Sequence, residues 1–160
     1  MKTEYTVGED GKALIAKRSF QAPLEKVWQA WTSSEKLDAW WGPLPYKALT
    51  DSYEFSEGGE WRYRMVGPEG DAHHCINKYV TIVPGKEFTA VDSFCNEDWS
   101  IKTELPESHW TVAFTESEGV TSIVVTTTYA TPEALQTVSE MGMKEGFDMG
   151  LNQLEALLAQ

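Results

Sequence analysis

The stretch SFQAPLEKVWQAWTSSEKLDAWWGP, from Ser19 to Pro43, decides how the rest of this chain must fold. It holds four of the seven tryptophans in a short run. Its first half carries apolar residues at the spacing i, i+3, i+4 and i+7, which forms one helical face: Leu24, Val27, Trp28 and Trp31. A helix this rich in tryptophan has to bury its aromatic face against a large apolar surface, and the remaining chain must supply that surface.

The boundaries of two short helices follow from the same stretch. Ala22-Pro23 opens the first helix, because the fixed φ angle of proline and its missing N–H are tolerated in a first turn. Ser33 or Ser34 can cap a second helix over Glu35 to Ala39. Gly42-Pro43 ends that helix, since both residues are costly in a helix interior. The sequence therefore predicts two consecutive amphipathic helices.

Extended segments surround these helices. The pattern is clearest where Trp61, Tyr63 and Met65 alternate with two arginines, because period-two alternation is typical of a half-buried strand. One strand is predicted before the helices and six after them: Ala13 to Phe20, then Tyr46 to Phe55, Trp61 to Met65, His73 to Val83, Glu87 to Phe94, Trp110 to Phe114 and Val120 to Tyr129. The inward face of His73 to Val83 stays undecided, and Asn96 to Pro106 is predicted to be a loop.

The C-terminal segment is predicted to be helical with a break. Thr131-Pro132-Glu133 is a strong helix start, combining a capping hydroxyl, a proline and an acid. Two apolar stripes that follow are rotated away from each other, which predicts a kink near Glu140 to Gly142. Gly142, Gly146 and Gly150 recur at a spacing of four residues. They indicate either close packing on the sheet or a concave space beside the helix.

Composition excludes several classes of function. The formal net charge of −12 argues against binding to DNA or RNA, which requires a clustered positive surface. No apolar run is long enough to span a membrane, and the first residues have no signal-peptide pattern. A length of 160 residues fits one domain, residues 1–160. These features predict a single-domain cytoplasmic protein.

Two cysteines are too few for a disulfide framework. A hairpin that turns at Pro84-Gly85 would set Cys75 close to Phe94 and Cys95, within one residue of cross-strand pairing. A bulge could bring the two sulfur atoms together. Reduced thiols are favoured because the cytoplasm keeps cysteines reduced.

The sequence shows no catalytic or metal-binding constellation. His73 and His74 are neighbours in a predicted strand, so their side chains point to opposite faces and do not share an ion. His109 stands alone, and neither a phosphate-binding glycine loop nor a nucleophile elbow is present. We therefore expect no metal and no cofactor, and we assign no catalytic residue.

The order of motifs resembles the START-like (SRPBCC) superfamily, and within it the homologues of the activator of heat-shock-protein-90 ATPase. The resemblance covers nearly the whole chain and rests on five motifs: Phe20-x-Ala22-Pro23-x-x-x-Val27-Trp28-x-Ala30-Trp31-Thr32, Trp40-Trp41-Gly42-Pro43, Gly58-Gly59-x-Trp61, Met65-x-Gly67-Pro68-x-Gly70, and Gly146-Phe147 followed by Leu151 and Leu154. Phe147 departs from the pattern, since similar proteins often carry tryptophan there. The resemblance implies an α+β helix-grip fold, β-α-α-β6-α, with a curved antiparallel sheet wrapped around a long C-terminal helix.

Three functions remain open on this basis. The first is a cavity between sheet and helix that binds an apolar or aromatic small molecule, with these lining residues: Trp61, Tyr63, Met65, Trp110, Phe114, Met143, Glu145 and Phe147. Glu145 would be an acid facing the cavity, although such a glutamate is more often solvated. The second, implied by the family, is activation of a chaperone ATPase through an outer surface. The third is a polyketide-cyclase-like enzyme, and a homodimer is also left open.

Overall fold

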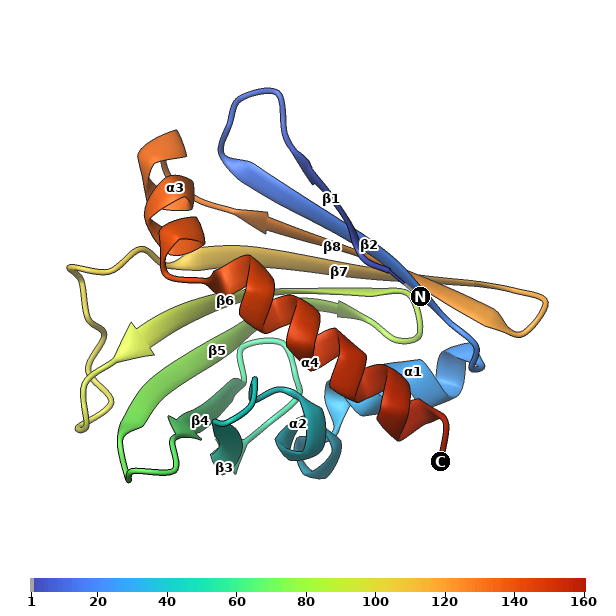
Figure 1. Cartoon of the computed structure of the whole chain (residues 1–160), viewed down its shortest axis with the longest axis horizontal. Helices are drawn as coiled ribbons and strands as arrows, with labels where there is room; N and C mark the ends of the chain where they lie inside the picture. The colour runs from blue at the N-terminus through green and yellow to red at the C-terminus, as the bar shows by residue number, and fades with distance from the viewer. Residues whose placement is uncertain (1) are drawn as a thin grey trace.

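The computed structural model describes residues 2–160 as an eight-stranded antiparallel sheet with four helices (Figure 1). The strands follow the order β1-β2-β8-β7-β6-β5-β4-β3 across the sheet. Their bounds are β1 Glu4–Val7, β2 Ala13–Phe20, β3 Lys47–Tyr53, β4 Glu60–Val66, β5 Ala72–Val83, β6 Glu87–Cys95, β7 Ser108–Ser117 and β8 Val120–Thr128. The helices are α1 Leu24–Thr32, α2 Ser34–Trp40, α3 Pro132–Glu140 and α4 Met143–Leu158. The curved sheet bends around α4, which crosses its inner face (Figure 1).

The predicted helix-grip fold is confirmed, with one strand more than expected. The short strand β1 pairs with β2 at the edge of the sheet, and its four residues fall in a polar stretch without an alternating pattern. The C-terminal break lies where it was predicted, because α3 ends at Glu140 and α4 begins at Met143. Gly142 makes this break with a φ of 87°, a left-handed conformation that glycine adopts without steric cost.

The tryptophan-rich stretch forms α1 and α2 as predicted. Val27 and Trp31 are buried on the inner side of α1, whereas Trp28 is only half-buried. The indole N–H of Trp40, at the end of α2, donates to the carbonyl of Ala30 at 2.8 Å and ties the two helices together. Ser33 occupies the N-cap position of α2, but its side chain makes no capping hydrogen bond.

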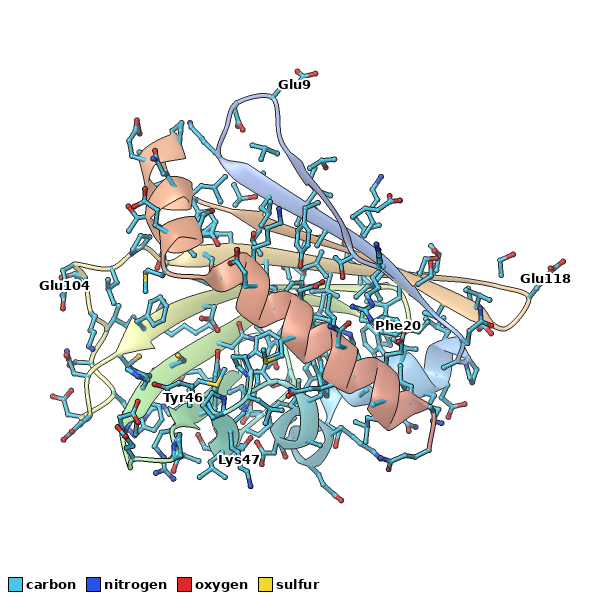
Figure 2. The ribbon with its side chains drawn as sticks, in the orientation of Figure 1. Glu9, Phe20, Tyr46, Lys47, Glu104 and Glu118 are labelled. Atoms are coloured by element: carbon cyan, nitrogen blue, oxygen red, sulfur yellow. The ribbon has the colours of Figure 1, made fainter. Side chains whose placement is uncertain are left out.

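Aromatic side chains pack closely against one another beneath α1 and α2. Trp31 contacts Trp40 edge-on, with ring centroids 4.8 Å apart, and Trp28 contacts Phe114 at 5.1 Å. Glu104 and Glu118 instead project from loops at the periphery (Figure 2). The core is therefore a continuous aromatic layer beneath α1 and α2.

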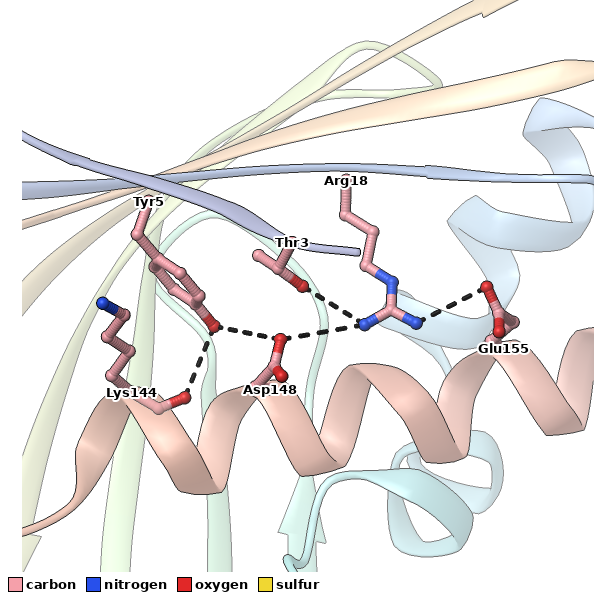
Figure 3. Close-up of polar contacts among 6 residues, drawn as sticks. All are labelled: Thr3, Tyr5, Arg18, Lys144, Asp148 and Glu155. Atoms are coloured by element: carbon pink, nitrogen blue, oxygen red, sulfur yellow. Dashed lines mark hydrogen bonds and ion pairs between the residues drawn. The ribbon is translucent and has the colours of Figure 1, made fainter. Parts of the chain in front are cut away.

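A buried arginine on β2 holds α4 against the sheet (Figure 3). Arg18 lies on the inward face of the strand, and 1% of its side chain is exposed. Its guanidinium lies 3.9 Å from the Asp148 carboxylate and 3.4 Å from that of Glu155, both on α4, and it donates to Thr3 at 3.2 Å. The hydroxyl of Tyr5, on β1, reaches Asp148 at 3.4 Å. The N-terminal edge of the sheet thus fixes the position of this helix.

The register of β5 and β6 answers two questions that the sequence left undecided. Cys75, Asn77 and Tyr79 are buried and border the interior spaces, so they form the inward face of β5. Cys75 pairs with Phe94, as the predicted hairpin requires, and Cys95 pairs with His74. Adjacent positions on a strand point to opposite faces, so the two thiols lie on opposite sides of the sheet. Both cysteines are free, which confirms the prediction of two reduced thiols and excludes the disulfide.

Candidate functional site

A cavity of about 400 Å³ lies between the inner face of the sheet and the first half of α4. Strands β4, β5, β6 and β7 form its floor, and the connection from α2 to β3 forms one side. The end of α3, the break and the first two turns of α4 form the roof. Its walls are mostly apolar and aromatic, as is usual for sites that bind small molecules.

The glycines of α4 divide between the two roles that their spacing suggested. A Cβ atom at Gly146 would meet only Pro43, at an ordinary contact distance of 3.5 Å. A Cβ atom at Gly150 would lie 3.3 Å from the carbonyl oxygen of Trp40, which is a tight contact with backbone. Gly150 therefore serves close packing of α4 on the end of α2, whereas Gly146 leaves space at the cavity.

Four aromatic rings form a continuous wall of the cavity. Trp41 lies 5.7 Å from Trp110 and 6.4 Å from both Tyr63 and Phe147, measured between ring centroids. Trp110 and Phe147 are 5.5 Å apart at an interplanar angle of 82°. Edge-to-face contacts of this kind stabilise the wall and hold the ring faces in fixed orientations.

One carboxylate interrupts this apolar wall. Asp92 lies on β6 and its Oδ2 accepts a hydrogen bond from the hydroxyl of Tyr63 at 3.0 Å. Burial raises the pKa of Asp92 to about 7, although the hydrogen bond from Tyr63 acts in the opposite direction. The pKa of Tyr63 is also raised, first by burial and then by the nearby Asp92 charge. Among the described residues that line the cavity, none is a lysine or an arginine.

A second polar group lies at the rim. The hydroxyl of Tyr46 donates to Asp71 at 2.6 Å, and the imidazole of His73 lies 3.4 Å from the same carboxylate. The hydrogen bond from Tyr46 lowers the pKa of Asp71, so this acid carries a negative charge at neutral pH. Tyr46 and His73 both border the cavity.

The structure places five of the eight predicted ligand-binding residues on the cavity wall: Tyr63, Met65, Trp110, Met143 and Phe147. It does not bring the other three there. Trp61 is 1% exposed, stacks on Tyr63 at 4.0 Å and lies behind Trp41. Phe114 is buried beneath α1, against Trp28. The expectation that these two residues line the cavity is therefore wrong.

Glu145 is corrected in the same way. It is exposed on α4, on the side of the helix away from the face that carries Met143, Gly146 and Phe147, and it does not line the cavity. The acid that does face the cavity is Asp92, which sequence reasoning missed. A signal for it exists: Phe88, Ala90 and Phe94 alternate on β6 as inward positions, and Asp92 lies in the same register.

Two further tests concern metals and membranes. Within residues 2–160, no group of three or more histidine, cysteine, aspartate or glutamate side chains is arranged to hold a metal ion. No helix in this part of the chain has the length and apolar character needed to cross a bilayer.

This architecture defines the class of protein. An unclosed, curved antiparallel sheet that grips a C-terminal helix above an apolar cavity is the START-like (SRPBCC) arrangement. The model of the family described as "Activator of Hsp90 ATPase homolog 1-like protein" matches residues 21–159. The chain belongs to this family, and the predicted resemblance is confirmed.

Solved structures agree with this assignment. Protein Ms6760 from Mycobacterium smegmatis is 33% identical, with a TM-score of 0.89, over 98% of this chain and 96% of that one. A protein from Arthrobacter aurescens is 28% identical, with a TM-score of 0.92, over 98% and 91% of the two chains. The AHSA1 protein from Silicibacter pomeroyi, at 22% identity and a TM-score of 0.72 over 92% and 97%, shares the fold. No curated protein matches the sequence.

Proposed function

We propose that this protein binds a small apolar or aromatic molecule in the cavity between the sheet and α4. The observation that carries the proposal is a cavity of about 400 Å³ with apolar and aromatic walls between the sheet and α4. Small-molecule sites commonly measure about 300–1,000 Å³ and have apolar, aromatic walls. A ligand in the cavity would bury these apolar walls, which favours binding.

The proposed contacts come from residues on the wall. Trp41, Trp110 and Phe147 offer ring faces and edges to an aromatic ligand. Met65 and Met143 are flexible and polarizable, so they adapt to ligands of different shape. This composition favours recognition by shape and apolar contact.

The test uses 1-propylnaphthalene, equilibrium dialysis and the variant Gly146→Leu. The native protein is expected to bind the probe, and binding is expected to shift the NMR signal of the Trp110 indole N–H. Trp99, which contacts His74 on the outer face of the sheet, serves as the internal reference for that measurement. Gly146→Leu fills the cavity from α4, so its binding is expected to fall at least tenfold without loss of folding.

The matched control is Met149→Leu, which places leucine at an exposed position of the same helix. This variant should bind the probe as the native protein does. Absence of binding by the native protein, or equal binding by Gly146→Leu, would contradict the proposal.

A role in a chaperone complex is the alternative, and the family match is the observation that favours it. Such a role would use an outer surface and leave the cavity without direct contact to the partner. Stimulation of the ATPase of purified Hsp90 tests it, and Gly146→Leu should then be as active as the native protein. Polyketide-cyclase-like catalysis also stays a prediction, and Asp92 would be its acid or base.

A further inference from the structure

Asp92 lies where the cavity ends deep inside the protein. Together with Trp41 and Trp110 it borders both the cavity and a smaller space behind it, which Asn77 and Tyr79 also border. Its carboxylate accepts one hydrogen bond, from Tyr63, and the residue remains partly open to the cavity. Among residues 2–160, no lysine, arginine or histidine forms an ion pair with it. A carboxylate in such a place is costly to ionise, unless a partner supplies the opposite charge.

We propose that the cavity selects ligands that carry a protonated amine on an apolar or aromatic body, with the Asp92 carboxylate as the anchor for the ammonium group. This proposal rests on the proposed function, because it names the chemical class of ligand for the same cavity.

The aromatic wall suits a cation as well as an apolar body. Trp41, Trp110 and Phe147 line the same cavity as Asp92, and aromatic rings attract ammonium groups to their faces through their quadrupoles. A carboxylate at the end of an aromatic wall combines the two interactions that stabilise a desolvated ammonium: an ion pair and cation–π contacts.

The charge of the protein points the same way. The net charge of −12 and the charged Asp71 at the rim favour approach of cations and oppose that of anions. No positively charged lysine or arginine side chain lines the described part of the cavity, so a ligand carboxylate would have no counter-charge there. Fatty-acid-like anions are therefore poor candidates, although their chains would fit the apolar wall.

Most other titratable groups near Asp92 stay neutral around pH 7. Their pKa values are all raised by burial: Tyr63 on β4, Cys75 and Tyr79 on β5, Cys95 at the end of β6, and Tyr129 after β8. Lys102, in the loop after β6, acts electrostatically on Cys75 and forms no ion pair with Asp92. His73 lies at the rim beside Asp71, and the variant His73→Gln removes its imidazole from the comparison between pH 6 and pH 8.

The ionisation of Asp92 makes a specific pH dependence testable. With a pKa of about 7, Asp92 is about one-tenth ionised at pH 6 and about nine-tenths ionised at pH 8. Only the ionised form pairs with an ammonium group, and an alkylamine stays protonated throughout this range. Affinity for an amine should therefore rise about tenfold from pH 6 to pH 8.

The experiment compares 2-(1-naphthyl)ethylamine with 1-propylnaphthalene, in which a methyl group replaces the ammonium. Dissociation constants are measured by equilibrium dialysis at pH 6 and pH 8, with the native protein and with His73→Gln. We expect the amine to bind about tenfold more tightly at pH 8 in both proteins, and 1-propylnaphthalene to bind equally at the two pH values.

Asp92→Asn is the matched variant, because asparagine still accepts the Tyr63 hydrogen bond but carries no charge. It should lower amine affinity at pH 8 at least tenfold, abolish the pH dependence and keep binding of 1-propylnaphthalene. If Asp92→Asn fails to fold, the pH series on the native protein decides alone. Tighter binding of 1-propylnaphthalene than of the amine at pH 8 would overturn this inference and leave the proposed function standing. If neither probe binds, the proposed function fails as well.

Discussion

Two aromatic regions line the inner face of the sheet, and one is filled whereas the other is hollow. Beneath α1, Trp28 and Trp31 pack against Phe88 and Phe114, with ring centroids 5.1–6.3 Å apart. Beneath the first half of α4, rings with the same kind of edge-to-face contacts border a cavity of about 400 Å³. Aromatic content alone therefore does not decide whether an interior is solid.

The difference comes from the helices above the two regions. α1 presents Val27 and Trp31 directly to the sheet, so its side chains fill the space below it. α4 has Gly146 facing the cavity, and the break at Gly142 turns α3 away from the axis of α4. Missing side chains and a change of direction together leave the volume open. The filled region supports the fold, and the hollow one is available to a ligand.

The largest expected effect is in the filled region. Trp31 is 2% exposed and contacts rings on α2, β6 and β7, so Trp31→Ala should cost about 3–5 kcal/mol of unfolding free energy. Trp110→Ala, on the half-buried cavity wall, should cost about 1–2 kcal/mol because less surface is buried there. Urea denaturation of both variants measures the contrast. Equal losses would show that the two regions are packed alike.

An intermediate effect concerns the acid in the hollow region. The folded state raises the pKa of Asp92 from 3.8 to about 7, so it binds the proton more tightly than the unfolded chain does. The contribution of protonated Asp92 to the free energy of unfolding is fully present below about pH 4 and is lost as pH rises through 7. Asp92→Asn should remove this loss. The unfolding free energy of the variant minus that of the native protein should therefore be about 2–4 kcal/mol larger at pH 8 than at pH 4.

Urea denaturation across this pH range checks the prediction. His109→Gln is the control, because His109 is exposed beside Glu107 and lies on the opposite strand face from its cavity-lining neighbours Ser108 and Trp110. Parallel curves for the native protein and Asp92→Asn would mean that Asp92 is not in an apolar environment.

The smallest expected effect distinguishes two glycines on the same helix. Gly150→Leu forces a side chain against the Trp40 carbonyl, the same oxygen that accepts a hydrogen bond from Gln153, and should cost about 1–3 kcal/mol. Gly146→Leu places its Cβ at an ordinary contact distance from Pro43, beside the cavity, and should change stability by less than about 1 kcal/mol. Thermal unfolding of the pair measures the difference. A larger loss for Gly146→Leu than for Gly150→Leu would indicate that the cavity is filled.

Local patterns account for the elements that were predicted correctly. The helical spacing of Leu24 to Trp31, the alternation around Tyr63 and the start at Thr131-Pro132 each depend on a few neighbouring residues. They predicted both short helices, most of the strands and the C-terminal break. β1 was missed because four residues of mixed polarity carry no period that can be recognised, and pairing with β2 is what makes them a strand.

The cavity could be predicted from the sequence only in part. Alternation identified Tyr63, Met65 and Trp110 as inward residues, and all three lie on its wall. The same rule assigned Trp61 and Phe114 to the cavity, because alternation tells which face a residue occupies and not how deep it lies. Depth depends on what covers the strand, and here Trp41 and Trp28 cover those two positions.

By itself, the sequence determined the order of helices and strands and the aromatic character of the interior, since these follow from periodicity and turn residues. The order of its motifs, through their resemblance to known proteins, predicted the helix-grip fold and the family. The tertiary structure alone decided which rings border open space, that the two cysteines lie on opposite faces, and that the acid in the cavity is Asp92 rather than Glu145. The reason is that volume and burial arise between elements distant in the chain. The position of α4 relative to the inner face of the sheet fixes both, and no local pattern specifies that position.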